Sequence, residues 1–373
     1  MNKFIITNGK IILPGRVLEG GVLAVENGTI RDIAEKPGEY PGYEIIDAQR
    51  CYVSPGLVEM HIHGCSSFGF DEDDPQILDK TTAFLSERGI NTFVPTIQCN
   101  EAALANLADG LERGGYGDRI PGVYIEGPFV NEKNRGGILP RHIRMPDMGY
   151  MEKLLEISRG HIKLMTVAPE LKGCPDIYDL LYENGITLCL GHSHAELHQV
   201  PAFDDRKMDL THLFNTMSPV SHKKTGLAML PFINPHVYVE VNADLIHLNA
   251  DIITMCHKHL NKDRLILITD AVASAGAPYG SYFYFKKEVV SDEHGVRYKD
   301  DNTMVGSNCL ITEVVKRFMK VTGSPIYEAV GFATLNPCRL LGLDKSKGSI
   351  EIGKEADLVI FDEDFNVVKN LWM

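Results

Sequence analysis

The feature that most constrains the fold of this chain is the regular alternation of apolar β-type runs with helix-like segments. Runs rich in branched apolar residues recur at residues 57–63, 91–97, 120–126, 162–168, 186–192, 209–212, 237–243 and 265–270. Helical patterns separate most of them, as at residues 73–89, 101–115, 175–185 and 251–262. About eight β-then-α units of roughly thirty residues indicate a parallel sheet, and eight units can close a (β/α)8 TIM barrel. We expect this α/β barrel, with a doubly wound open sheet as the competing architecture.

Both ends of the chain have the pattern of short strands separated by turns. FIITNGKIIL at residues 4–13 predicts a hairpin with its turn at Asn8-Gly9, and residues 21–35 repeat the pattern with Asn27-Gly28. Residues 348–368 are again alternating and rich in turn residues. Since chain termini often lie close together, we expect residues 1–53 and 345–373 to form one small β domain beside a barrel of residues 54–344.

Composition excludes several classes of partner. Thirty-seven basic and 50 acidic residues give a formal charge of −13, which disfavours binding to nucleic acid or anionic lipid. Eight cysteines are scattered without a C-x-x-C pair, as is usual for reduced thiols in the cytoplasm. No signal-peptide pattern opens the chain, and no apolar run approaches the ~18 residues of a membrane span. We therefore expect a cytoplasmic protein without a nucleic-acid or membrane partner.

Polar side chains stand where the predicted strands end. His61 and His63 are two residues apart, so in a strand both point to the same face. Because the carboxyl ends of barrel strands meet at one rim, residues at several strand ends should converge there. A lone histidine at such a place is usually structural, but several imidazoles and carboxylates together are typical of a divalent-metal site. The strand ends carry His61, His63, Thr96, Gln98, Glu126, Glu170, His192, His212, Asn242, Asp244 and Asp270.

The flanking sequences suggest separate roles for these residues. Glu126 ends the apolar strand of VYIEGPF, and a buried carboxylate there needs a cation as its partner. Together with His192 and His212 it forms a common hydrolytic zinc set, which leaves one position for water and lowers the pKa of that water. Asp270 ends the last predicted strand in LILITDAVASAG. Alone it could cap a helix, but opposite an activated water it would be a good general base.

Several motifs together resemble those of the amidohydrolase superfamily and, within it, the N-acetylglucosamine-6-phosphate deacetylases. They are PGLVEMHIHG, IEGPF, GHSHA, THLFNTM, ADLIH, TDAVASAG, MVGSN and the tail from Asn336 to Asp362, so the resemblance runs nearly end to end. It implies a (β/α)8 barrel with a small β-sandwich built from both termini. It also implies removal of acetate from the 2-acetamido group of a phosphorylated amino sugar, most directly N-acetylglucosamine 6-phosphate.

The resemblance also implies a role for each matching residue. Glu126, His192 and His212 match metal ligands, and Asp270 matches the catalytic acid/base. The expected cofactor is one divalent ion, with zinc preferred over iron, manganese or cobalt, and His61 with His63 leaves room for a second. Members of the family are often homodimers, so a homodimer is an expectation here too. The positions that match substrate contacts are Asn215, Thr216 and His247, and Met304, Val305 and Gly306 match a loop that closes on the sugar.

Two positions depart from the family pattern and affect substrate recognition. Lys223 stands where an arginine usually binds the substrate phosphate, and lysine can bind phosphate only as a point charge. After IEGPF, Arg135 replaces a lysine and Ile138 replaces a polar sugar contact, for which Arg141 or His142 could substitute. Two alternatives therefore stay open: an amidohydrolase for another N-acyl substrate, phosphorylated or not, and a non-catalytic sugar-phosphate binding protein.

Overall fold

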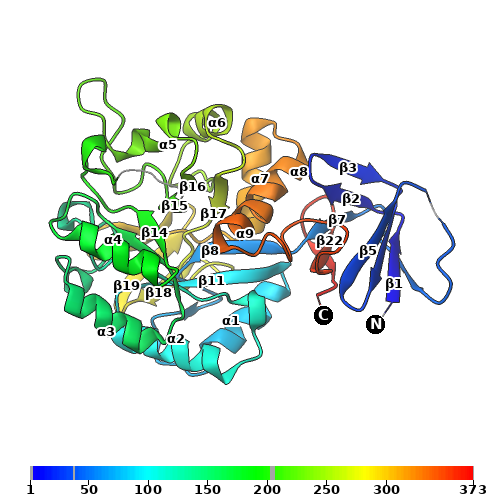
Figure 1. Cartoon of the computed structure of the whole chain (residues 1–373), viewed down its shortest axis with the longest axis horizontal. Helices are drawn as coiled ribbons and strands as arrows, with labels where there is room; N and C mark the ends of the chain where they lie inside the picture. The colour runs from blue at the N-terminus through cyan, green and yellow to red at the C-terminus, as the bar shows by residue number, and fades with distance from the viewer. Residues whose placement is uncertain (1–2, 37, 202–205, 373) are drawn as a thin grey trace.

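A closed parallel barrel forms the centre of the molecule. The computed structural model describes residues 3–36, 38–201 and 206–372. Eight parallel strands pair in sequence order, and the barrel closes where the Asp270 N–H donates to the His61 carbonyl at 3.0 Å (Figure 1). Every strand lies within or overlaps one of the eight predicted runs, so the barrel prediction is confirmed. The strands are β8 (Leu57–Ile62), β11 (Ile90–Gln98), β12 (Val123–Glu126), β13 (Ile162–Val167), β14 (Thr187–Leu190), β15 (Met208–Leu210), β16 (Tyr238–Asn242) and β17 (Leu265–Ile268).

Helices cover the outside of the barrel, and four of them overlap the predicted helical segments at residues 73–89, 101–115, 175–185 and 251–262. Their apolar faces pack with outward-facing strand residues in one large core, which includes Leu104, Ile125 and Val315. None of the described helices is long and apolar enough to cross a membrane. The helices are α1 (Ile77–Ser86), α2 (Glu101–Arg113), α3 (Met148–Ser158), α4 (Cys174–Glu183), α5 (Leu230–Ile233), α6 (Ala250–His259), α7 (Ile311–Thr322), α8 (Ile326–Phe332) and α9 (Leu335–Leu341).

Strands from both ends of the chain form a second, smaller unit beside the barrel (Figure 1). Its two sheets share a core that includes Phe4, Leu23, Val53 and Ile360, which makes a β-sandwich. The division of the chain after residue 53 and before residue 345 stays a prediction. One sheet has the order β5 (Thr29–Ala34), β4 (Val22–Glu26), β1 (Lys3–Thr7), β6 (Glu44–Asp47), and the other β23 (Val367–Asn370), β22 (Leu358–Phe361), β7 (Tyr52–Pro55), β2 (Lys10–Leu13), β3 (Arg16–Glu19).

One of the two predicted hairpins is wrong. β4 and β5 pair through a two-residue turn at Asn27-Gly28, and both turn residues have positive φ, as a type I′ turn requires. In contrast, β1 and β2 belong to different sheets, so the chain at Asn8-Gly9 turns a corner between them. The Asn8 carbonyl accepts the Arg50 N–H at 2.7 Å, and a Cβ on Gly9 would lie 2.8 Å from Val53. Packing against this neighbouring segment prevails over the local hairpin preference.

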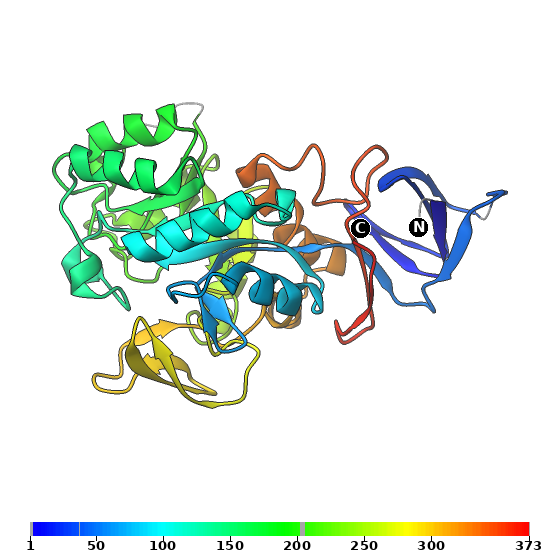
Figure 2. The same ribbon diagram turned by 90° about the horizontal axis from the view of Figure 1, so that it is seen from below.

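A small antiparallel sheet between β17 and α7 was not predicted from the sequence. It consists of β18 (Gly280–Tyr284), β19 (Lys287–Asp292), β20 (Gly295–Tyr298) and β21 (Met304–Gly306), and Figure 2 shows it projecting below the barrel in yellow. The Phe285 N–H at its first turn donates to the Asp71 carboxylate at 3.0 Å. Residues 304–306, expected as a loop, are thus a strand that borders the barrel rim. Two further short strands, β9 (Gly64–Cys65) and β10 (Phe68–Gly69), pair with each other after β8.

Candidate metal centre and active site

Glu126, His192 and His212 form a compact cluster at the carboxyl ends of β12, β14 and β15. The Glu126 Oε1 lies 2.8 Å from the His192 Nε2 and 3.0 Å from the His212 Nε2. The two imidazole nitrogens lie 3.1 Å apart, and all three side chains are buried. In β12, Tyr124 points into the barrel and contacts the His61 ring, so Glu126, two residues later, is on the same inner face.

The partner of the other His192 nitrogen fixes the proton on its ring. Nδ1 lies 2.9 Å from the Asn134 carbonyl oxygen, which can only accept a hydrogen bond, so Nδ1 carries the proton. In the neutral ring Nε2 then directs a lone pair toward the cluster. A lone pair facing a carboxylate oxygen and a second imidazole is stabilised by a cation between them.

A second cluster joins the first through Glu126. It contains His61, His63 and Asp270, whose ligand atoms lie within 4.8 Å of one another. The His61 Nε2 is 3.7 Å from Asp270 Oδ1 and 3.8 Å from Glu126 Oε1, and it has no hydrogen-bond partner although it is buried. The His63 Nε2 is 3.4 Å from Asp270 Oδ1 and 3.5 Å from Glu126 Oε2. Glu126 therefore presents its two oxygens to different histidines, as a carboxylate between two ions would.

These separations fit divalent-metal ligation. Zinc ligands about 2.0–2.1 Å from the ion in a tetrahedron lie roughly 3.3 Å from one another, and most of the distances above fall near this value. The donors are all imidazole nitrogens and carboxylate oxygens, which suit zinc, iron, manganese or cobalt. An orphaned, fully buried His61 Nε2 is a further sign that a ligand belongs there.

The electrostatics keep both carboxylates ionised. Burial alone would raise the pKa of Glu126, but His192 and the other imidazoles outweigh it and hold this pKa well below its usual range. Burial alone would likewise raise the pKa of Asp270. The neighbouring His63, His61 and His247 outweigh burial, so this pKa is lowered. An ionised Asp270 can accept a proton at neutral pH.

His247 is held by a carboxylate of its own. Its Nδ1 lies 2.7 Å from Asp244 Oδ2, and its Nε2 lies 3.6 Å from Asp270 Oδ2. Burial lowers the pKa of the His247 imidazole, but Asp244 and Asp270 outweigh burial and raise it. The ring thus presents a polar nitrogen to the cavity on the opposite side of Asp270 from the histidines of the second cluster.

The backbone at the rim is strained at several of these residues. His192, His212 and Asp270 have φ values of 49°, 28° and 52°, in the left-handed region that non-glycine residues seldom adopt. Each lies two residues beyond the end of its strand, where the chain leaves the barrel. Strain of this kind clusters at binding and catalytic sites, where it fixes the direction of side chains.

A cavity of about 240 Å³ opens beside the two clusters. Gly136 and Gly137 let one wall approach closely, because a Cβ on Gly136 would lie 2.6 Å from Thr216 Cγ2 and one on Gly137 would lie 3.0 Å from Val305 Cα. Six positions predicted as substrate contacts, Asn215, Thr216, His247, Met304, Val305 and Gly306, line this cavity. The other lining residues are Gln98, Glu126, Gly136, Gly137, Ile138, His192, His212, Asp270, Tyr284 and Thr303.

Lys223 is not brought into this cavity. It lies in an exposed loop, and the lining residues among the described part of the chain include neither lysine nor arginine. Arg135 donates to the Ile138 carbonyl at 2.9 Å and Arg141 donates to the Phe285 carbonyl at 3.2 Å, so both bind backbone oxygens. Ile138 does line the cavity and is 1% exposed.

Glu170, predicted at a strand end, does not line the cavity, and two further residues near the clusters were not predicted from the sequence. Glu170 accepts from Ser193 Oγ and the His194 N–H and so holds the loop around His192 instead of lining the cavity. Tyr284 reaches the cavity from β18, and no pattern in its sequence neighbourhood predicts this. Glu240 lies buried beneath the clusters. The sequence feature that could have indicated it is a single acidic residue inside the apolar run of β16.

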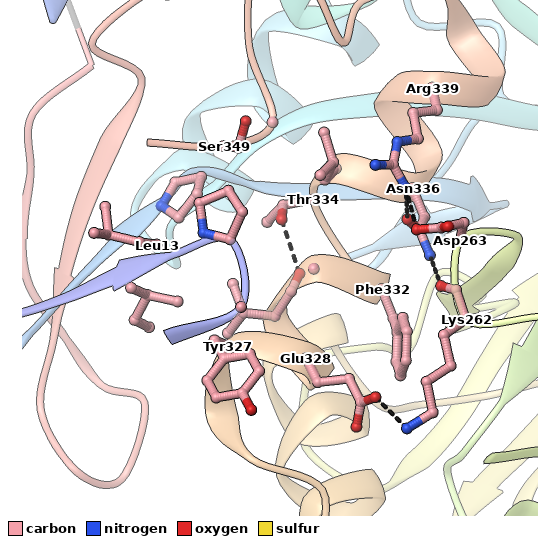
Figure 3. A pocket seen from close by; sticks show the side chains of 18 residues that line it. Leu13, Lys262, Asp263, Tyr327, Glu328, Phe332, Thr334, Asn336, Arg339 and Ser349 are labelled. Carbon is pink, nitrogen blue, oxygen red and sulfur yellow. Dashed lines mark hydrogen bonds and ion pairs between the residues drawn. The ribbon is translucent and has the colours of Figure 1, made fainter. Parts of the chain in front are cut away.

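A second cavity of about 240 Å³ lies between β2 and the helices α8 and α9 (Figure 3). Its charged groups are already paired: Lys262 with Glu328, and Arg339 with Asp263 at 2.9 Å. Within the described ranges, no group of potential metal ligands lies among its lining residues. The rim cavity is therefore the candidate active site.

Known proteins that are similar to this chain include deacetylases of amino-sugar phosphates. The sequence profile of the Amidohydrolase family matches residues 52–371. An N-acetylgalactosamine-6-phosphate deacetylase of Escherichia coli O157:H7 is 29% identical, over 86% of this chain and 85% of its own. An N-acetylglucosamine-6-phosphate deacetylase of Vibrio furnissii is 29% identical, over 92% of this chain and 87% of its own. The crystal structure of N-acetylglucosamine-6-phosphate deacetylase from Pasteurella multocida aligns with a TM-score of 0.89 and 26% identity, covering 99% of this chain and 98% of that one.

Proposed function

Since the chain belongs to the amidohydrolase family, we propose that it is a deacetylase that converts N-acetylglucosamine 6-phosphate to glucosamine 6-phosphate and acetate. The single observation that carries this proposal is the meeting of Glu126, His192, His212 and Asp270 at the wall of one cavity, with His61 and His63 3.7 and 3.4 Å from Asp270. Hydrolysis of an amide needs both an electrophilic centre and a proton-transfer group, and this arrangement offers both. The names of the related proteins from Escherichia coli and Vibrio furnissii support the substrate class.

We assign the first ion to Glu126, His192 and His212, with zinc as the metal. His61, His63 and Asp270 would hold a second ion, with Glu126 between the two. When bound, a divalent ion polarises the amide carbonyl and lowers the pKa of the attacking water. The proton assigned to His192 Nδ1 leaves its Nε2 free for this role.

Asp270 performs the proton transfers in this proposal. Its carboxylate takes a proton from the attacking water as the water oxygen bonds to the carbonyl carbon. The same carboxyl then gives the proton to the sugar nitrogen as the carbon–nitrogen bond breaks, which leaves acetate and a free amine. The His247 ring, which Asp244 keeps in place, faces Asp270 and the substrate.

The remaining lining residues would orient the sugar and exclude water. Asn215 and Thr216 are fixed by hydrogen bonds to the backbone of residues 212–215, so they offer a rigid edge to the substrate. Val305 and Gly306 of β21 cover the other side, and Lys223 would meet the phosphate from the outer loop. We also propose a cytoplasmic location and a homodimer, as the scattered thiols and the family resemblance suggest.

A second candidate follows from the absence of lysine and arginine among the described lining residues. A cavity with apolar Ile138 and no lysine or arginine of its own also suits an unphosphorylated N-acetylhexosamine or another N-acyl compound. In that case Lys223 would play no part in binding, because it lies outside the cavity.

The test is acetate release by the metal-loaded protein from four substrates: N-acetylglucosamine 6-phosphate, N-acetylgalactosamine 6-phosphate, N-acetylglucosamine and an N-acetyl amino acid. We expect the highest kcat/KM on N-acetylglucosamine 6-phosphate. No release from either sugar phosphate would overturn the proposed substrate class. A higher kcat/KM on the unphosphorylated sugar would favour the second candidate.

A further inference from the structure

Glu240 lies under both candidate metal clusters and contacts one histidine of each. It is on β16, is 0% exposed and has its Oε2 2.8 Å from the His61 Nδ1. The same oxygen accepts the His212 N–H at 2.9 Å. One carboxylate oxygen thus joins a side chain at the end of β8 to the backbone at the end of β15.

The backbone of Glu240 reinforces this connection. Its carbonyl oxygen accepts the Leu213 N–H at 2.9 Å, so consecutive amides of the β15 exit are both bound by residue 240. His212 there has a φ of 28°, a conformation that surrounding contacts must hold in place. Glu240 supplies two of those contacts, one from its side chain and one from its main chain.

The position of the His61 ring is the second consequence. With Nδ1 directed to Glu240, the opposite Nε2 is directed to the space between Asp270 and Glu126, where it has no hydrogen-bond partner. A histidine that donates from one nitrogen to a carboxylate presents the other as a more basic metal ligand. The contact therefore sets the direction in which the His61 Nε2 points.

Two other buried acids differ from Glu240 in this respect. Glu59 accepts the N–H groups of His61 and Thr269, at 3.2 and 3.4 Å, and touches no imidazole nitrogen. Asp209 has no hydrogen-bond partner for either side-chain oxygen. A general need for negative charge inside the barrel would not explain why only one of the three acids binds a ligand ring.

We propose that Glu240 is a positioning residue that holds His61 and the backbone of His212 in metal-ligating geometry and so couples the two clusters. This inference rests on the proposed metal-dependent function. Glu240 itself lies below the ligands and does not line the cavity, so it acts through them.

The experiment is a cobalt(II) titration of the metal-free full chain, followed by the visible absorption of the bound ion and by metal content after desalting. The variants are Glu240→Leu and Glu240→Gln, with Glu59→Gln as the matched control for loss of a buried acid. We expect two ions per wild-type chain. The dissociation constant of the weaker ion should rise about 100-fold in Glu240→Leu and about 10-fold in Glu240→Gln, which keeps an acceptor oxygen.

Glu59→Gln should bind both ions like the wild type and keep their absorption bands. If Glu240→Leu does not fold, the 10-fold effect in the nearly isosteric Glu240→Gln carries the test. Three results would overturn the proposal: unchanged binding of the weaker ion in the Glu240 variants, equal weakening in Glu59→Gln, or saturation of the wild type at one ion. Because no turnover is involved, a wild type that binds two ions but releases no acetate would refute the proposed substrate and leave the role of Glu240 standing.

Discussion

Two cavities among the described residues have similar volumes, about 240 Å³ each, but opposite distributions of charge and bonding. In the cavity between β2 and the helices α8 and α9, lysine and arginine side chains pair with nearby carboxylates (Figure 3). At the barrel rim, two carboxylates converge on four histidines, and the buried His61 Nε2 has no partner. In the first cavity these charged groups have partners within the protein, whereas the groups at the rim would be stabilised by a bound cation.

The comparison shows that volume alone does not identify a functional site. Polar groups in the helix-side cavity stabilise the fold, because each charge has a local partner. Those at the rim cost stability in the absence of a ligand, since buried ionised groups without full pairing are unfavourable.

The largest effect should follow removal of the carboxylate shared by the two clusters. Glu126→Gln replaces a charged ligand by a neutral amide and should reduce both metal content and acetate release, the latter by at least about 10³-fold. Glu328→Gln in the helix-side cavity should leave metal content and turnover unchanged. Full metal occupancy in Glu126→Gln would contradict its assignment as a ligand.

A smaller effect is expected for Lys223→Met. If Lys223 binds the substrate phosphate, kcat/KM should fall about 10–100-fold for the phosphorylated sugar and stay constant for N-acetylglucosamine. Lys262→Met, which removes a lysine of the helix-side cavity, serves as the control. An equal loss of kcat/KM on both substrates, or no loss, would contradict a role of Lys223 in binding the phosphate. Such a result would agree with the position of Lys223 outside the cavity.

Glycine-to-alanine substitutions in the two cavities should change the free energy of unfolding by different amounts. Gly136 has a φ of 54°, and an added Cβ would lie 2.6 Å from Thr216, so Gly136→Ala should lower the free energy of unfolding by about 1–2 kcal/mol. Gly331 of α8 lines the helix-side cavity with open space around its Cβ position, so Gly331→Ala should be neutral or slightly stabilising. Chemical denaturation measures both, and equal effects would contradict the close approach at the rim.

The smallest effect concerns how the contribution of Glu328 in the helix-side cavity to stability depends on pH. Burial raises the pKa of Glu328, but Lys262, His257 and Ser324 outweigh it, so its pKa is lowered on folding. A lowered pKa stabilises the fold above the unfolded value of about 4.3 and loses that contribution as pH falls through the folded value. Glu328→Gln should therefore lower Tm by about 1–2 °C at pH 7 and by progressively less as the pH falls below about 4. A constant Tm difference across this range would contradict the ion pair.

The sequence predicts the barrel and much of the candidate site, because both follow periodic rules. Strand runs repeat at regular intervals, and the ends of parallel strands must share a rim, so His61, Glu126 and Asp270 could be placed together in advance. The corner at Asn8-Gly9 could not, since packing on Val53 rather than local turn chemistry decides it. Tyr284 also escaped prediction, because its position depends on how the β18–β21 sheet folds over the rim.

Acidic residues inside apolar strands are a sequence feature that indicates polar groups buried beneath the site. Glu59, Asp209 and Glu240 each interrupt an apolar run, and all three are fully buried beneath the clusters. Burial of an acid requires a partner. Which acid faces a ligand ring depends on strand register, and only the three-dimensional structure supplies that for Glu240.

The central claim is that the barrel rim performs a metal-dependent deacetylation in which Asp270 transfers the proton. The most direct measurement compares acetate release from N-acetylglucosamine 6-phosphate by the wild type and Asp270→Asn at equal metal content. The account predicts release by the wild type and a kcat lower by about 10²–10⁴-fold in Asp270→Asn, which keeps the shape but not the basicity of the side chain. A metal-loaded Asp270→Asn variant with wild-type kcat would contradict it.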